Sequence, residues 1–167
     1  AIFFSPRATQ ILQEKFRNKY LDFITQQVWF WAFIVSVVIE VFICGLQGKD
    51  AWRYGILVIP AWATSMAIQF IFPVIVPIRW DKFGRELPVV PIRLQQFKQS
   101  DNVNGLLYNG LPSNHLGMML AGVLLALFMA PHDSLGPEPW YALALFFLLL
   151  AIFFCFAVIY LGEHYIQ

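Results

Sequence analysis

The sequence predicts an all-α protein, a polytopic bundle of transmembrane helices. Of its 167 residues, 59% are hydrophobic and only 13% are charged, and its mean hydropathy is +0.65. A soluble domain carries about 25% charged residues, so this chain has too little polar surface to remain in water. Four long apolar segments, residues 28–46, 55–78, 116–130 and 140–161, are predicted to cross the membrane. The net charge of +1 gives no indication of a nucleic-acid partner.

Residues 1–27 are predicted to form an amphipathic helix that lies at the membrane surface. Ser5 followed by Pro6 is typical of an N-cap and a first helical position. Apolar residues then recur at helical spacing, with cations between them: Ile11, Leu12, Phe16, Tyr20, Phe23 and Ile24. This pattern is typical of an interfacial helix, although an ordinary packed helix also fits it.

Residues 28–167 are predicted to form the transmembrane core. A span needs roughly 20 apolar residues. The second segment contains Pro60, Pro73 and Pro77, which bend or end it, and the third reaches nearly full length only with residues 113–115. Tryptophans near the segment ends fit an aromatic belt. Cys44 and Cys155 lie inside apolar segments, which predicts thiols rather than a disulfide or a metal pair.

Counting the membrane crossings gathers four polar residues at one face. If the third segment crosses and the fourth returns, His115 at the start of one and His164 after the end of the other lie on the same side. Arg79 follows the second span and also ends on that side, together with Ser113. His132 falls in the loop on the opposite side.

This set of residues suits phosphoryl transfer. A helix start offers free N–H groups and the positive end of the helix dipole, which favour an anion. Arg79 can grip phosphate oxygens, and two histidines can act as nucleophile and general acid without a metal ion. Simpler interpretations stay open: Ser113 as an N-cap, Arg79 as a headgroup anchor and either histidine as a structural residue.

Three short motifs occur in order over residues 72–167. They are "FPVIVPIR" at 72–79, "LPSNHLGMM" at 111–119 and "YLGEHYIQ" at 160–167. The motif at 111–119 resembles the P-S-x-H motif of the type 2 phosphatidic acid phosphatase superfamily, which includes vanadium haloperoxidases. The motif at 160–167 resembles the G-E-H-Y form of that superfamily's last motif. The motif at 72–79 is similar to a stretch of the inositolphosphotransferase-like branch, the branch of inositol phosphorylceramide synthases, with Ile78 in place of a proline.

The resemblance implies a role for each site residue. His164 would be the nucleophile that forms a phosphohistidine, and His115 the general acid for the leaving group. Ser113, Asn114 and the backbone N–H groups that follow would hold the phosphoryl oxygens, with Arg79 neutralising their charge. The implied protein is a metal-independent integral-membrane lipid phosphatase or phosphotransferase without a cofactor. Its substrate would be a phospholipid, an isoprenoid phosphate or a sphingolipid phosphate.

The chain departs from the superfamily pattern in two places. Ala157 and Val158 stand where the broader superfamily has Ser-Arg, and the family aspartate belongs at a position 168, after Gln167. The family has six spans, so we expect this chain to be the central portion of such a protein, with a further span on each side. The aspartate would hold the His164 imidazole in its attacking tautomer.

The side of the membrane that bears these residues is predicted differently by two arguments. Nine cations lie on the side of the site, and only Lys49 and Arg53 lie on the other. By the positive-inside rule, that count puts the site in the cytosol. The resemblance implies an extracytoplasmic site, and a site for phosphate attracts cations for its own reasons.

One charge lies inside a predicted span. Glu40 occupies an apolar segment, where a carboxylate is costly and suggests a functional site. A polar residue of the next span, such as Gln69, could pair with it. We assign it no catalytic role.

Two other classes of function stay open. His115 and His164 on adjacent helices could ligate haem b in an electron-transfer protein, although no second interior histidine pair occurs and Ser113 at the helix start does not suit it. A non-catalytic membrane scaffold that kept the fold is the other alternative.

Overall fold

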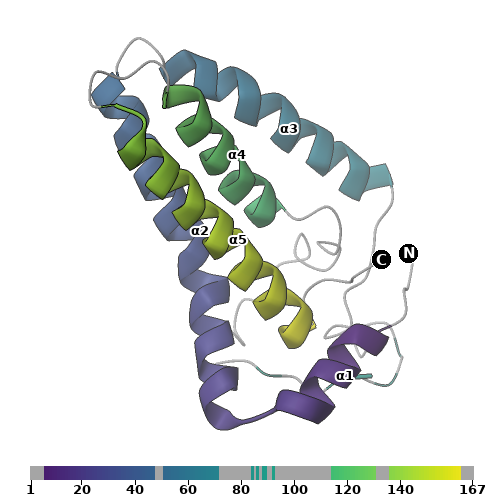
Figure 1. Ribbon diagram of the computed structural model, residues 1–167. Helices are drawn as coiled ribbons and strands as arrows, with labels where there is room; N and C mark the ends of the chain where they lie inside the picture. Colours follow the sequence, from purple (N-terminus) through teal and green to yellow (C-terminus); the bar gives the residue numbers. More distant parts are fainter. Residues whose placement is uncertain are drawn as a thin grey trace.

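The computed structural model describes residues 6–47, 51–71, 84, 86, 88–89, 92, 114–130 and 136–162. This part of the chain contains five α-helices and no strand: α1 Arg7–Phe16, α2 Lys19–Gln47, α3 Ala51–Ile71, α4 Asn114–Met129 and α5 Glu138–Leu161 (Figure 1). The all-α prediction is therefore confirmed.

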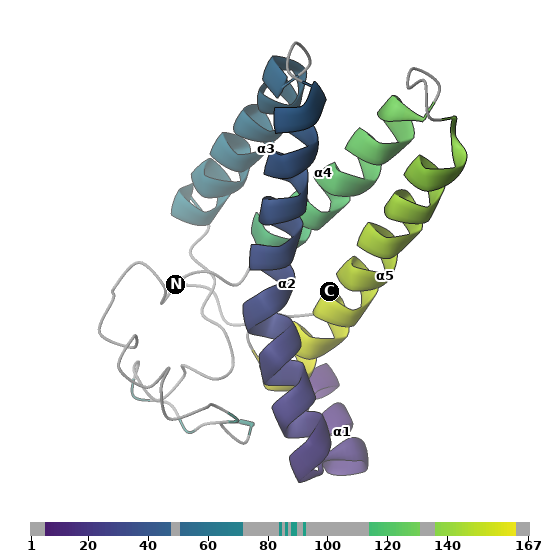
Figure 2. The same ribbon diagram turned by 90° about the vertical axis from the view of Figure 1, so that its left-hand side faces the viewer.

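The helices form a bundle with α1 lying across one end (Figures 1 and 2). α2, α4 and α5 contact one another, and α3 contacts α4 and α2. α2 and α4 run in the same direction, and α5 runs antiparallel to both. α1 contacts α5 at the end of the bundle where α5 finishes and α2 begins.

Asn18 separates α1 from α2. Its side-chain oxygen accepts hydrogen bonds from the backbone N–H groups of Tyr20 at 3.0 Å and Leu21 at 2.9 Å, and its amide donates to the Phe16 carbonyl at 3.1 Å. It therefore N-caps α2 and satisfies a carbonyl that the end of α1 leaves free. The single helix predicted over residues 1–27 is instead two helices, because this cap starts a new one at Lys19.

The face by which α1 packs is polar. Its buried residues are Thr9 and Gln13, one turn apart, whereas the side chains of Ile11 and Phe16 are 49% and 46% exposed. Of the apolar residues in the predicted pattern, Leu12 packs against the buried cluster of Ile92, Tyr160 and Leu161. Ile11 and Phe16 face outward, which suits contact with lipid, and placement at a membrane surface stays a prediction for this helix.

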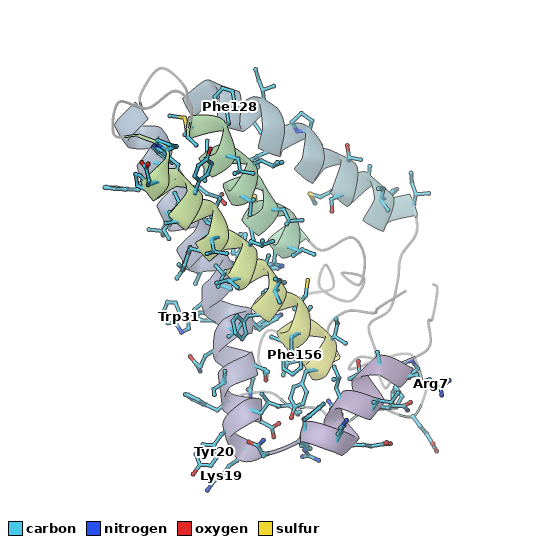
Figure 3. All side chains as sticks on the ribbon, in the orientation of Figure 1. Arg7, Lys19, Tyr20, Trp31, Phe128 and Phe156 are labelled. Atoms are coloured by element: carbon cyan, nitrogen blue, oxygen red, sulfur yellow. The ribbon has the colours of Figure 1, made fainter. Side chains whose placement is uncertain are left out.

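Several polar residues of α2 face the bundle, and many of its large apolar residues face outward. Thr25, Gln26, Ser36 and Glu40 are all buried. The exposed large side chains lie on the opposite face, and Tyr20 and Trp31 point away from the bundle (Figure 3). These exposed residues are Tyr20, Phe23, Ile24, Trp31, Ile34, Val35, Val38, Val41 and Phe42. A surface helix of a soluble protein has the reverse arrangement, so the outer face of α2 suits a lipid environment.

Two helices are long and apolar enough to cross a membrane: Lys19–Ile43 within α2 and Glu138–Leu161, which is α5. In the most apolar 18-residue stretch of each helix, only 28% and 33% of the residues are buried. The core helix of a soluble protein is mostly buried. An apolar surface of this extent would be unstable in water, so these features favour a membrane protein. The predicted segment 140–161 corresponds to α5, and 28–46 lies within the longer α2.

The other two predicted spans are shorter apolar helical segments, Val58–Ile68 in α3 and His115–Met129 in α4. α4 has 16 residues, or about 24 Å of helix, against roughly 30 Å for a bilayer core. Pro60 lies inside α3 without ending it. Residues 72–78 of the second predicted span, with Pro73 and Pro77, lie outside the described residues.

α2, α4 and α5 pack in layers that repeat every seven residues. In one layer the ring of His115 contacts those of Phe33 and Phe154. The next layer consists of Glu40, Gly122 and Phe147. Glu40 and Gly122 come seven residues after Phe33 and His115, and Phe147 comes seven residues before Phe154 because α5 is antiparallel. A seven-residue repeat keeps the same faces of packed helices together, so the three helices share one register over about 10 Å.

Gly122 gives α2 room to approach α4. A Cβ at this position would lie 2.7 Å from Oε1 of Glu40 and 2.8 Å from Cδ1 and Cε1 of Phe147. Both neighbouring side chains are completely buried and have little space to move away. The carboxyl of Glu40 therefore occupies space that any side chain at position 122 would need. Gly117, in the same helix, has no atom within 4 Å of its corresponding Cβ position.

These two glycines give a matched test of the packing. Gly122→Ala should lower the free energy of unfolding by about 1–3 kcal/mol, because it overpacks a filled site. Gly117→Ala should be neutral or raise it by about 0.5–1 kcal/mol, because alanine restricts the unfolded chain and meets open space. Unfolding in mixed micelles, followed by tryptophan fluorescence, measures both. Equal effects of the two variants would contradict the close approach of α2 and α4 at Gly122.

Candidate functional site

His115 is the one predicted site residue whose side chain the structure describes. Arg79, Ser113 and His164 lie outside the described residues. Asn114 is the first residue of α4, but its side chain is outside them too. The start of α4 agrees with the predicted helix start at the P-S-x-H motif. The proximity of His115 to His164 and Arg79 thus stays a prediction.

His115 lies in the first turn of α4 and is half-buried. Its ring centroid is 4.7 Å from that of Phe33 on α2, with the two planes at 74°, and 5.8 Å from that of Phe154 on α5. Two phenyl rings on different helices thus restrict where the imidazole can turn. The backbone N–H groups of this first turn are among the helix donors that have no intrahelical acceptor, so they and the helix dipole favour an anion nearby.

α5 ends at Leu161, seven residues after Phe154, the residue that packs beside His115. α1 contacts this end of α5. Gly162 follows the helix in the left-handed conformation, with φ 77°, and its N–H bonds to the carbonyl oxygen of Ile159 at 3.1 Å. Thr9 Oγ1 also donates to the Ile159 carbonyl, at 2.7 Å, and Gln13 Nε2 donates to the Tyr160 carbonyl at 2.8 Å. Thr9 thus gives the Ile159 carbonyl a second donor and Gln13 gives the Tyr160 carbonyl a donor, so α1 stabilises the last turn of α5.

A second contact ties the same turn to α2. The hydroxyl of buried Tyr160 donates to Oδ1 of Asp22 at 2.5 Å. Nε of Arg17 lies 3.9 Å from Oδ2 of the same carboxylate, but the Arg17 side chain is 48% exposed, so this ion pair contributes little. Buried Ile92 packs with Tyr160 in the same cluster. We call Thr9, Gln13, Asp22 and Tyr160 the α5 clamp.

The α5 clamp lies at some distance from His115 along α5. His115 packs beside Phe154, seven residues before Leu161, which corresponds to about 10 Å along the helix. Gly162, in the left-handed conformation, ends α5.

Sequence reasoning missed the α5 clamp. Thr9 and Gln13 stand four residues apart on a short helix, and Asp22 is an acid near the start of an apolar segment. Each is a weak signal in the sequence. The residues around them do not show that carbonyls at the end of a distant helix need hydrogen-bond donors. The suggested pairing of Glu40 with Gln69 cannot be followed, since the Gln69 side chain lies outside the description.

Among the residues that the structure describes, His115 is the only histidine, and no group of three or more metal-binding side chains occurs. The haem alternative requires His164 as a second ligand, so it too lies outside them. Comparison of the chain with protein-family models, curated proteins and solved structures finds no match. Its function is therefore inferred from its own residues.

Tyr160→Phe tests the α5 clamp. Removal of the hydroxyl leaves the partly buried Asp22 carboxylate without this donor and should lower the free energy of unfolding by about 1–3 kcal/mol. Tyr20→Phe is the matched control, because the Tyr20 side chain is 69% exposed and the change should stay within about 0.5 kcal/mol. Denaturant titration in micelles compares the two. If Tyr160→Phe is as stable as Tyr20→Phe, the hydrogen bond to Asp22 contributes nothing to the clamp.

Proposed function

We propose that this protein is an integral-membrane phosphatase or phosphotransferase that acts on a lipid phosphate through a phosphohistidine intermediate. In this proposal α3 and α4 also cross the bilayer, giving a four-span catalytic core that belongs to a larger six-span enzyme. The exposed apolar faces of α2 and α5 support a membrane-embedded core. The motif resemblance supplies the chemistry, with the active site extracytoplasmic.

The placement of His115 carries the proposal. It lies in the first turn of a helix whose free N–H groups favour an anion, and it packs directly against α5, the helix that leads toward His164. It is only half-buried, so its ring can reach a bound substrate. Phe33 and Phe154 hold the ring in a restricted orientation, which general acid catalysis requires.

The reaction takes place in two steps. In the first, a ring nitrogen of His164 forms a bond to phosphorus as the bond to the lipid oxygen breaks, and His115 gives that oxygen its proton. In the second, water or an alcohol attacks the phosphohistidine, His115 accepts the attacking group's proton, and the bond from phosphorus to His164 breaks. Water releases phosphate and an alcohol yields a new phosphoester, so the acceptor decides between hydrolysis and transfer.

The phosphoryl oxygens need stabilisation in both steps. Arg79, Ser113, Asn114 and the first-turn N–H groups of α4 supply donors in this proposal, in the manner of an oxyanion site. The lipid tail does not need a pocket that shields it from water. Leu120 and Leu124 on α4 are exposed and form an apolar outer surface near this turn. A substrate can therefore approach while its chains stay in the bilayer.

Inhibitors distinguish this mechanism from metal-assisted hydrolysis. Activity should persist in EDTA and should be inhibited by vanadate, since vanadate adopts the five-coordinate geometry that the phosphate site stabilises. Release of phosphate from a lipid phosphate in detergent micelles measures both effects. Strict dependence on magnesium together with insensitivity to vanadate would exclude the phosphohistidine mechanism.

The two histidines should respond differently to the leaving group. His164→Asn should abolish phosphoenzyme with every substrate, because no bond to phosphorus can form. His115→Ala should slow lipid substrates by roughly 10²–10⁴-fold, the usual size of general acid catalysis. It should retain far more activity on p-nitrophenyl phosphate, whose leaving group needs little protonation. Steady-state rates of both variants on both substrates test this.

Two control variants make the comparison interpretable. His132→Ala changes the histidine predicted to lie at the opposite face and should leave both activities unchanged. His115→Asn keeps a polar side chain between Phe33 and Phe154, so it separates loss of the proton donor from loss of packing. Equal loss on both substrates for both His115 variants would assign phosphate binding to His115. Unaltered activity in the His164 variant would exclude His164 as the nucleophile. A haem absorption spectrum of the purified protein would then identify the electron-transfer alternative.

A further inference from the structure

Residues 14–20, where α1 meets α2, form an exposed corner of the protein that is rich in cations. Every residue of this stretch is exposed, and its charged members are Glu14, Lys15, Arg17 and Lys19. Three cations and one acid give the stretch a net charge of +2. Lys19 and Tyr20 point away from the bundle at its end (Figure 3). We call residues 14–20 the basic corner.

Exposed aromatic side chains alternate with the cations of the basic corner. The ammonium of Lys15 lies 5.3 Å from the centroid of the Phe16 ring, and the ammonium of Lys19 lies 5.2 Å from that of the Tyr20 ring. Each pair therefore presents a positive charge and an apolar ring side by side. One turn further along α2, the exposed side chain of Phe23 extends this apolar surface.

Two helices that are apolar enough to span a membrane end at the level of the basic corner. The apolar stretch of α2 begins at Lys19, and α5 ends at Leu161. The hydrogen bond from Tyr160 to Asp22 places the end of α5 beside the first turn of α2. In the sequence, no charged residue occurs between Asp22 and Glu40. If the two helices cross a bilayer, the corner therefore meets its headgroup layer.

The acid of the first turn of α2 contributes little to neutralising the corner. Asp22 accepts the Tyr160 hydroxyl through Oδ1, and Nε of Arg17 approaches Oδ2 only to 3.9 Å. The Arg17 side chain is 48% exposed, so an external anion can replace this weak contact at small cost. The guanidinium can then donate to phosphate oxygens.

We propose that the basic corner binds the headgroup of an anionic phospholipid. Lys15, Arg17 and Lys19 contact the phosphate, and the rings of Phe16 and Tyr20 lie at the boundary of the acyl chains. A zwitterionic headgroup carries its own cation, so the corner favours a lipid with net negative charge. The proposal depends on the membrane placement of α2 and α5 and is independent of the proposed phosphoryl transfer.

Photo-crosslinking of the intact chain in nanodiscs tests the proposal. Two probes, phosphatidylglycerol and phosphatidylcholine with the same diazirine in one acyl chain near the glycerol, are each added to phosphatidylcholine nanodiscs. Both leaflets carry the probe, so the result does not depend on orientation. Peptic digestion and mass spectrometry then measure the labelling of residues 14–24.

We expect the phosphatidylglycerol probe to label residues 14–24 at least about fivefold more than the phosphatidylcholine probe, the effect of roughly one cation near a headgroup layer. This ratio should fall toward one as sodium chloride is raised from about 0.1 M to about 1 M, because salt screens exposed charges. The exposed apolar side chains of α5 carry no cation and give an internal control, with a ratio of about one. They include Leu145, Ile152 and Phe153.

Charge substitutions of both signs sharpen the test. The triple variant Lys15→Gln, Arg17→Gln, Lys19→Gln should bring the ratio to about one, since it removes every cation of the corner. Glu14→Gln removes the acid and should keep or raise the ratio. Unfolding followed by tryptophan fluorescence checks that both variants keep the fold of the wild type.

Four results would overturn the proposal. Equal labelling by the two probes in the wild type would leave the cations to water or to an acidic partner protein. An unchanged ratio in a folded triple variant would mean that these cations do not select the lipid, and a lower ratio in Glu14→Gln would mean that net charge does not. An equal preference for phosphatidylglycerol on α5 would make it a property of the whole lipid-facing surface.

Discussion

Close contact between α2, α4 and α5 depends on small side chains where the helices meet. In a bilayer, lipid tails are as apolar as leucine, so helices associate through tight packing rather than through the exclusion of water. Gly122 leaves room for the side chains of Glu40 and Phe147, and Ala32, Ser36 and Ala151 are small buried residues on the adjoining helices. The shared seven-residue register follows from this packing, because only one axial offset aligns these residues on all three helices.

The α5 clamp meets a second requirement of an apolar environment. A carbonyl without a hydrogen-bond donor costs several kcal/mol in hydrocarbon, so the end of a long helix needs partners. Thr9 and Gln13 supply them from a helix far away in the sequence, and Asp22 holds the same turn through Tyr160. The amphipathic α1 thereby fixes the place at which α5 ends and the following chain begins. Its polar residues Thr9 and Gln13 make these hydrogen bonds, whereas Ile11 and Phe16 remain exposed.

The common register also separates two polar side chains of the bundle. His115 and Glu40 lie in different layers, about 10 Å apart along the bundle, with buried Met119 and Ala151 between them. Side chains at that separation do not exchange a proton directly. Any influence of Glu40 on His115 would act through the contact of α2 with α4, because both layers belong to those two helices.

Hydropathy and helix signals are local, so the sequence alone determined the helical class, the extent of α5 and the start of α4 at the P-S-x-H motif. Asn18 carried a local capping signal that would have divided the first 27 residues correctly. Tertiary structure decided which face of α1 packs, that Glu40 meets Gly122, and how far His115 lies from the end of α5. These depend on the rotation and axial offset of one helix against another, which side-chain volumes at distant positions set together and no single segment encodes.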